Sequence, residues 1–212
     1  KQKITIKIKE KNYDENKVTF DLTVNELTTS TKLSEWKNLT DTENAIVVSD
    51  GKSEGDKHTY YITFGADDKD IDYKIVPHII DKAENANSGI TFAKGTKATE
   101  EFTVDKIQPE VQVQLKHDQA KNESYYKDNC DMTVTYAERN FYEDGLSYDI
   151  ALGRDVIQTC THEELKEIEG ITVGEPIITG NTRTYTITFD GGSGKDEDYR
   201  ITPHIKDMAG NT

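Results

Sequence analysis

Two stretches of the chain gather carboxylates densely enough to suggest a metal site. They are "GADDKDIDY" (residues 65–73) and "GGSGKDEDY" (residues 191–199). Ca²⁺ is a hard cation that takes several carboxylate oxygens from one loop, but neither stretch has the ligand spacing of an EF-hand. A solvated acidic hairpin is therefore the alternative to a weak calcium site. The candidate ligands are Asp67, Asp68, Asp70, Asp196 and Asp198. No cofactor other than Ca²⁺ is indicated.

Two histidines, His78 and His204, recur at matching places in similar sequences. The alternation of the surrounding residues puts both on the polar face of a strand, beside Lys74 and Arg200. A histidine without a second histidine or cysteine at ligand spacing is more often a surface residue than a metal ligand. We therefore expect both histidines on the surface.

A glutamate also recurs, as Glu10 and Glu138, each with an asparagine two positions later. An active-site carboxylate is one interpretation, and a turn in which the glutamate accepts backbone N–H groups is the simpler one. No serine, cysteine or acid pair lies in a recognisable catalytic motif, and no glycine-rich loop joins a strand to a helix. The sequence thus predicts a protein that is not an enzyme.

The only cysteines are Cys130 and Cys160. If they pair, the disulfide closes a loop of about 30 residues and contributes about 3 kcal/mol in the chain-entropy model. Two free buried thiols are the alternative. Gln2 stands where the repeat described below places Cys130, so the fold does not depend on a disulfide framework.

The chain is acidic, with 40 aspartates and glutamates against 26 lysines and arginines in 212 residues, and a formal net charge of -14. This charge repels phosphate backbones and anionic lipid surfaces, so nucleic acid is not expected as a partner. No run of about 18 apolar residues exists, and the first residues lack the apolar core of a signal peptide. We therefore expect neither membrane insertion nor an export signal within these residues.

The most informative pattern is an internal repeat. "DYKIVPHIIDKAEN" (residues 72–85) returns as "DYRITPHIKDMAGN" (residues 198–211), with nine of fourteen positions identical. Residues 4–22 likewise align without a gap on residues 132–150. The chain therefore reads as two copies of one module, residues 1–104 and 105–212. The first copy lacks a counterpart of Val111–Leu115 and the second lacks one of Glu101–Asp105, which suggests a longer tandem array.

Each copy alternates apolar and polar residues in four segments, as half-buried antiparallel strands do. The expected inward residues of copy one are Ile4, Ile6, Ile8, Val18, Phe20, Leu22, Tyr60, Ile62, Phe64, Tyr73, Ile75, Pro77 and Ile79. Those of copy two are Met132, Val134, Tyr136, Leu146, Tyr148, Ile150, Tyr185, Ile187, Phe189, Tyr199, Ile201, Pro203 and Ile205. The prediction is an all-β fold. Asp81 and Asp207, which follow the last segment, are expected to accept backbone hydrogen bonds in a tight turn.

Between the second and third strands each copy carries a short helical insert, "LSEWKNL" (residues 33–39) and "THEELKEIEG" (residues 161–170). Thr161 and Glu164 have the spacing of a capping box. The inserts differ between the copies more than the strands do, so we expect binding specificity there. The candidate partner-binding residues are Leu33, Trp36, Leu39, His162 and Glu163. Trp36 either anchors its insert to the core or offers an exposed platform.

Three short motifs carry a family resemblance: "DKIQPEV" (residues 105–111), "AERNF" (residues 137–141) and "DMAGN" (residues 207–211). Together with a tyrosine that opens a late strand in "DY", they resemble the bacterial immunoglobulin-like repeats of large Gram-positive cell-surface proteins. The resemblance implies two tandem immunoglobulin-like β-sandwich modules with short helical inserts. Copy one departs from the closing motif, because Glu84 replaces the glycine.

The resemblance also implies a function, although a fold alone does not fix one. We expect a non-catalytic structural or adhesive segment of an extracellular, secreted or wall-anchored bacterial protein, monomeric within its array. A dedicated host-protein binder, for example of immunoglobulins, is the first alternative. An accessory region of an exported carbohydrate-active enzyme is the second. A host protein or glycan is the expected kind of partner.

Overall fold

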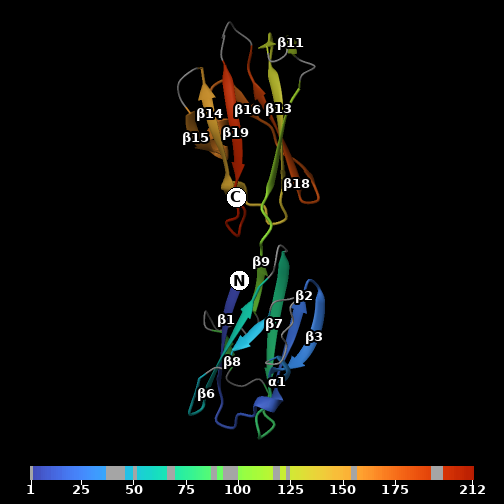
Figure 1. The fold of residues 1–212 in the computed structure, drawn as a ribbon, viewed down its shortest axis with the longest axis vertical. Helices are drawn as coiled ribbons and strands as arrows, with labels where there is room; N and C mark the ends of the chain where they lie inside the picture. The colour runs from blue at the N-terminus through green and yellow to red at the C-terminus, as the bar shows by residue number, and fades with distance from the viewer. Residues whose placement is uncertain are drawn as a thin grey trace. The chain divides into compact units, whose positions relative to one another are not determined.

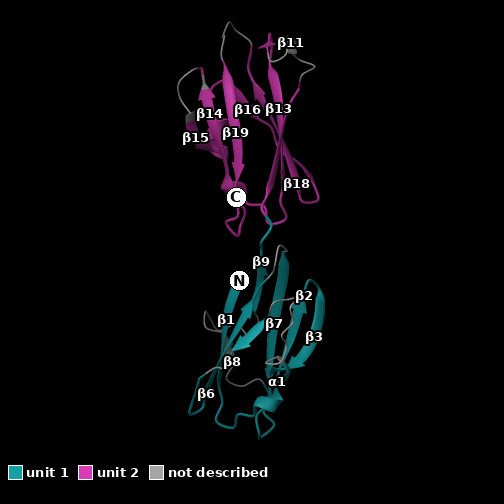
Figure 2. Ribbon diagram, in the orientation of Figure 1, with its two compact units in different colours: residues 1–107 teal, residues 108–212 magenta. Residues whose placement is uncertain are grey.

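The computed structural model describes most of the chain and shows an almost wholly β protein (Figure 1). The described residues are 2–36, 46–49, 52–65, 70–86, 90–92, 100–116, 120–122, 125–153, 157–191 and 198–212. The chain divides into two compact units, residues 1–107 and 108–212 (Figure 2). The expected boundary lay after Val104. None of the helices described is long and apolar enough to cross a bilayer.

Unit 1 consists of two antiparallel sheets. The first has the order β4-β6-β1-β8, with β5 also paired to β6; the second has the order β3-β2-β7-β9. The strands are β1 (Gln2–Lys9), β2 (Val18–Val24), β3 (Leu27–Lys32), β4 (Val47–Ser49), β5 (Ser53–Glu54), β6 (Lys57–Phe64), β7 (Ile71–Ile79), β8 (Ile90–Phe92) and β9 (Glu100–Val104). A 3-10 turn, η1 (Glu15–Lys17), precedes β2, and a one-turn helix, α1 (Leu33–Trp36), follows β3.

Unit 2 has the same plan. Its first sheet has the order β10-β13-β18-β16, with β17 also on β18, and its second the order β15-β14-β19. The strands are β10 (Glu110–Leu115), β13 (Cys130–Ala137), β14 (Leu146–Leu152), β15 (Ile157–Thr161), β16 (Ile171–Val173), β17 (Ile177–Thr179), β18 (Thr182–Phe189) and β19 (Tyr199–Ile205). A small ribbon joins β11 (Ala120–Asn122) to β12 (Tyr125–Tyr126). The short helices are η3 (Glu143–Gly145) and α2 (His162–Lys166).

Each unit buries one hydrophobic core between its two sheets, and the alternation in the sequence predicted most of it. All thirteen inward residues expected in unit 1 are buried. In unit 2 the exceptions are Tyr199, Ile201 and Pro203, which are half-buried. In unit 1, β9 pairs with β7, and Phe102 stacks on Tyr73 with ring centroids 5.3 Å apart. In unit 2 the described residues include no strand beside β19 at the place that β9 takes beside β7. The side chains of β19 therefore lack the neighbours that cover β7 in unit 1.

The turn after the last matching strand is built alike in both units, as predicted. Asp81 Oδ1 accepts the backbone N–H of Asn85 at 2.8 Å, and Asp207 Oδ1 accepts that of Asn211 at 2.9 Å. Glu84 has a φ of 69° and the matching Gly210 a φ of 92°. The left-handed conformation is strained for a residue with a Cβ atom. The same turn therefore costs more free energy in unit 1, at Glu84, than in unit 2, at Gly210.

This difference predicts that Glu84→Gly raises the free energy of unfolding of unit 1 by about 1 kcal/mol, because the strain at that position disappears. The matched change, Gly210→Ala, should lower that of unit 2 by about the same amount. A Cβ at Gly210 would meet only the Lys206 Cε, at 3.5 Å, so strain rather than a clash would act there. Urea unfolding of the full chain measures both effects. A Glu84→Gly variant no more stable than the parent would contradict the prediction.

Candidate functional site

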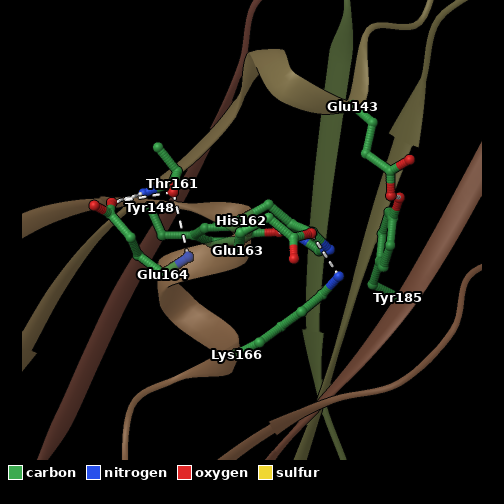
Figure 3. Close-up of polar contacts among 8 residues, drawn as sticks. All are labelled: Glu143, Tyr148, Thr161, His162, Glu163, Glu164, Lys166 and Tyr185. Atoms are coloured by element: carbon green, nitrogen blue, oxygen red, sulfur yellow. Dashed lines mark hydrogen bonds and ion pairs between the residues drawn. The ribbon is translucent and has the colours of Figure 1, made fainter.

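The α2 insert of unit 2 is where the sequence predicted partner-binding residues, and its first turn forms for local reasons. Thr161 Oγ1 accepts the backbone N–H of Glu164 at 3.2 Å, and Glu164 Oε2 accepts that of Thr161 at 2.8 Å (Figure 3). These reciprocal bonds make the predicted capping box, which satisfies two N–H groups that a helix start leaves unpaired. On the outside of α2, Lys166 Nζ lies 2.7 Å from Glu163 Oε1.

His162 and Leu33, two predicted partner-binding residues, are buried instead. They are 3% and 0% exposed. Strand pairing explains why: Lys32 lies opposite Thr19, and Thr161 lies opposite Ser147, a matching pair of positions in the two copies. Leu33 and His162 therefore occupy the same place, the first helical residue after the strand, where the side chain turns into the core. The expectation that they contact a partner is wrong.

A chain of hydrogen bonds ties His162 to the core. Tyr136 donates its hydroxyl proton to Tyr148 Oη at 3.1 Å, and Tyr148 Oη lies 3.0 Å from His162 Nδ1. Since the Tyr148 oxygen accepts from Tyr136, its own proton is available to Nδ1, which assigns the imidazole proton to Nε2. Nε2 is buried without a hydrogen-bond partner. The imidazole packs edge-on against Tyr185, with centroids 4.8 Å apart.

Burial keeps this cluster neutral. It lowers the pKa of His162, an effect that the charge of Lys166 strengthens. Three carboxylates act in the opposite direction: Glu143, Glu163 and Glu175. Burial also raises the pKa of Tyr148 to about 12 and raises the pKa values of Tyr136 and Tyr185. Neutral phenols and a neutral imidazole are weak acids and bases at pH 7, so the cluster stabilises the insert rather than supplying an activated group.

Unit 1 has apolar residues at the same three places. By the alignment and the strand register, Ile8, Phe20 and Leu33 match Tyr136, Tyr148 and His162, and all three are at most 1% exposed. One scaffold thus accepts either three apolar side chains or three polar ones that hydrogen-bond to one another. In both units these three side chains hold the short helix against the core.

The remaining predicted partner-binding residues have mixed outcomes. Glu163 lies on the outside of α2, with 76% of its side chain exposed. Trp36 is the last residue of α1, and its side chain lies outside the described part of the structure, as does the whole of Leu39. Neither interpretation of Trp36 is therefore tested.

Most of the predicted calcium ligands, Asp67, Asp68 and Asp196, lie outside the described residues. The Asp70 carboxylate accepts the backbone N–H groups of Lys106 at 3.2 Å and Ile107 at 3.4 Å. Asp198 is exposed, and its backbone carbonyl accepts the N–H of Gly153 at 2.8 Å. Asp70 thus holds the chain where unit 1 ends.

The two cysteines are both free thiols, so the disulfide alternative is not the one that the structure shows. Cys130 begins β13, opposite Phe189, whereas Cys160 lies in β15, opposite Tyr148, and these strands belong to different sheets. Burial raises the pKa of both thiols, which makes them poor nucleophiles at neutral pH.

The recurring histidines lie outward, as predicted, and each bonds a recurring aspartate. His78 Nε2 lies 2.7 Å from Asp21 Oδ2, and His204 Nε2 lies 3.0 Å from Asp149 Oδ2. The bond from His78 lowers the pKa of Asp21. The two aspartates occupy matching positions in the repeat, a signal from which these pairs could have been predicted. The recurring glutamates behave as expected: Glu138 Oε1, for example, accepts the N–H of Asn140 at 2.6 Å.

An exposed pair of isoleucines was also missed. Ile177 and Ile178 in β17 are 70% and 60% exposed. They pair with Thr184 and Arg183 at the beginning of β18, so the hairpin carries apolar side chains on both of its faces. A β-branched pair beside a proline and a glycine is a detectable sequence signal for such a hairpin.

Comparison of the chain with models of known protein families and with curated protein sequences finds no match. The interpretation of the site therefore depends on its own geometry.

The hydrogen-bonded cluster yields a test of how its members depend on one another. Tyr148→Phe should lower the free energy of unfolding of unit 2 by about 1–3 kcal/mol, because it leaves His162 Nδ1 and the Tyr136 hydroxyl unpaired. The triple variant Tyr136→Phe/Tyr148→Phe/His162→Leu should recover most of that loss, because no polar atom of the three is left unpaired. Urea unfolding at pH 7.5 measures both changes.

The same variants give a pH readout. The pKa of His162 is lowered in the folded state, so below about pH 6.5 the unfolded chain binds a proton that the folded chain does not. Stability from His162 is therefore complete above that pH and is lost as the pH falls. The parent should lose more stability than the triple variant between pH 7.5 and 5.5, since the other four histidines are common to both. Equal losses would contradict the assignment.

Proposed function

We propose that the chain is a non-catalytic structural and adhesive segment of a bacterial cell-surface protein, built from two immunoglobulin-like modules that space or present binding surfaces. The observation that carries the proposal is that the chain contains the same scaffold twice. The two copies share the hydrogen bonds that close turns and link strands, but they differ in their exposed side chains. Repetition of a rigid module extends the reach of a protein without adding chemistry.

The immunoglobulin-like assignment is supported by strand order and by one tyrosine. The strand orders β4-β6-β1 and β3-β2-β7-β9, in two antiparallel sheets, resemble those of that fold and so support the proposal. Tyr73 is buried near the start of β7 and donates its hydroxyl to the backbone oxygen of Gly65 at 3.1 Å. This contact resembles the tyrosine corner of immunoglobulin-like domains, in which a tyrosine at the start of a late strand bonds the backbone upstream.

The features that recur in both units serve the scaffold. The Asp81 and Asp207 turns close the late strands, and Glu10 and Glu138 hold the turns after the first matched strands. The pairs formed by His78 and His204 with their aspartates link neighbouring strands. Their recurrence as ties of turns and strands supports a structural role for the modules.

A spacer that transmits mechanical force should unfold one module at a time. Pulling the full chain from its two ends should give two separate force peaks, each releasing about 35 nm, because each unit has slightly more than 100 residues of about 3.5 Å extended length. Single-molecule force spectroscopy measures this directly. One peak that releases both units together, or extension without resistance, would contradict a spacer of two independent modules.

A second candidate function, binding of a host protein, is favoured by the exposed isoleucines of β17. Apolar side chains that protrude on a hairpin serve as anchors in protein interfaces. The hairpin begins two residues after Glu175, whose charge reaches Lys166 on α2, so it lies near the polar face of the insert. Unit 2 would therefore offer a partner both apolar anchors and charged groups.

Binding of purified human immunoglobulin to the full chain tests this candidate. Ile177→Ser/Ile178→Ser should weaken binding at least fivefold, because it removes the anchors. The matched control is Leu27→Ser/Val47→Ser in unit 1, where the side chains are 74% and 61% exposed; it should change binding less than twofold. Biolayer interferometry provides the measurement. No saturable binding by the parent, or equal loss in both variants, would leave the spacer role as the sole proposal.

A further inference from the structure

Four lysines surround one groove on the outer face of unit 1. The groove has a volume of about 390 Å³ and is lined by Lys7 and Lys9 of β1, Lys57 of β6, and Lys52 just before β5. Its size is within the range of small-ligand sites. Glu54 is the one carboxylate among its lining residues, so four positive charges face one negative charge.

The strand register forces these lysines together. Ile6 and Ile8 point into the core, so Lys7 and Lys9 must point outward from the same strand. Lys9 lies directly opposite Lys57 in the pairing of β1 with β6. Like charges placed opposite each other on neighbouring strands destabilise a sheet, so this arrangement costs stability.

Lys57 also lies opposite Glu54 in the pairing of β5 with β6, but the ion pairs that other described lysines form are missing at the groove. Elsewhere, Lys74 lies 2.7 Å from Glu101, and Lys116 lies 3.0 Å from Asp131. Within the described residues none of the four groove lysines forms an ion pair, although the chain carries 40 acidic residues. A cationic groove in a protein of net charge -14 leaves four exposed ammonium groups available to an anion.

The second unit shows that the scaffold does not need these lysines. Ala137 and Thr182 are directly opposite each other where unit 1 has Lys9 and Lys57. At the place of Lys7 and Thr59, Thr135 Oγ1 lies 2.9 Å from Thr184 Oγ1, a neutral hydrogen bond. The same strand pairing thus forms without lysines at these outward positions, so the lysines need an explanation other than folding.

We propose that this groove binds a short acidic oligosaccharide through its sulfate or carboxylate groups. The groove lies on the face of paired strands, so their backbone groups are engaged and cannot pair with an extended peptide. What it offers is ammonium groups together with the hydroxyls of Thr59 and Tyr61, which suit the anionic groups and hydroxyls of a sugar. A long polyanion would extend into the acidic remainder of the chain, so a short ligand fits better.

This inference goes beyond the spacer role and does not depend on it, because it concerns one groove of unit 1. The full chain is titrated with a chondroitin 4-sulfate tetrasaccharide, and with neutral chitotetraose as the comparison, by calorimetry and by amide NMR. Saturable binding of the sulfated sugar alone is expected, with shifts centred on Lys7, Lys9, Lys57 and Thr59. Its affinity should fall as NaCl is raised, since salt screens exposed charges.

Matched variants separate the groove from overall charge. Lys9→Gln/Lys57→Gln should weaken binding at least tenfold, while Lys74→Gln/Lys116→Gln, with the same change in net charge, should alter it less than twofold. The groove variant should also melt at a higher temperature than the parent at low salt, because the opposed charges are gone. Lys7→Gln/Lys52→Gln is a second groove variant that leaves the opposed pair intact, and it should weaken binding as well.

Three outcomes would overturn the proposal. The first is no saturable binding of the sulfated tetrasaccharide. The second is equal weakening by the groove and control variants, which would mean attraction by overall charge alone. The third is equal affinity for tetraglutamate, which would assign the groove to acidic peptides instead.

Discussion

Each unit depends on burying the apolar faces of two sheets against each other. Side chains alternate along a strand, so a shift of β1 by one residue against β6 would bring Lys7 into the core in place of Ile6 and Ile8. The register is therefore tightly specified by the core. The same constraint determines which residues lie outside, and so it places both the recurring histidines and the lysine groove. The outward surface of this protein is a consequence of its core pattern.

Within that constraint the two cores differ in polarity at three neighbouring positions. Unit 2 has Tyr136, Tyr148 and His162 where unit 1 has apolar side chains, and their hydrogen bonds make the exchange tolerable. A lone tyrosine or histidine at these positions would bury a polar group without a partner, which costs more than a hydrogen bond gains. The three positions therefore act as a unit, and the helix that follows each strand stays docked in either case.

The sequence predicted the strands and turns well, because their signals are local or periodic. Alternation over eight or nine residues identified the inward face, and the repeat identified the turn at Asp81 and Asp207. The insert residues were harder. A helix of four or five residues is too short for its periodicity to show a buried side, so Leu33 and His162 were assigned to the surface. The lysine groove was missed for another reason: its members come from separate segments, and only the pairing of β1 with β6 brings them together.

Comparison of the two units distinguishes residues that the fold requires from residues that it only tolerates. Residues shared by both units, such as the turn aspartates and the buried pair Ile62 and Ile187, are explained by folding. Lys9 and Lys57 are not shared, they oppose each other, and Ala137 with Thr182 shows a pairing free of that cost. A single surface lysine would need no explanation, since lysines are ordinary surface residues. Four that form no ion pair with a described residue, in a chain with so many carboxylates, place a local positive potential at one groove. An anion that binds there would screen the opposed charges and stabilise the folded unit.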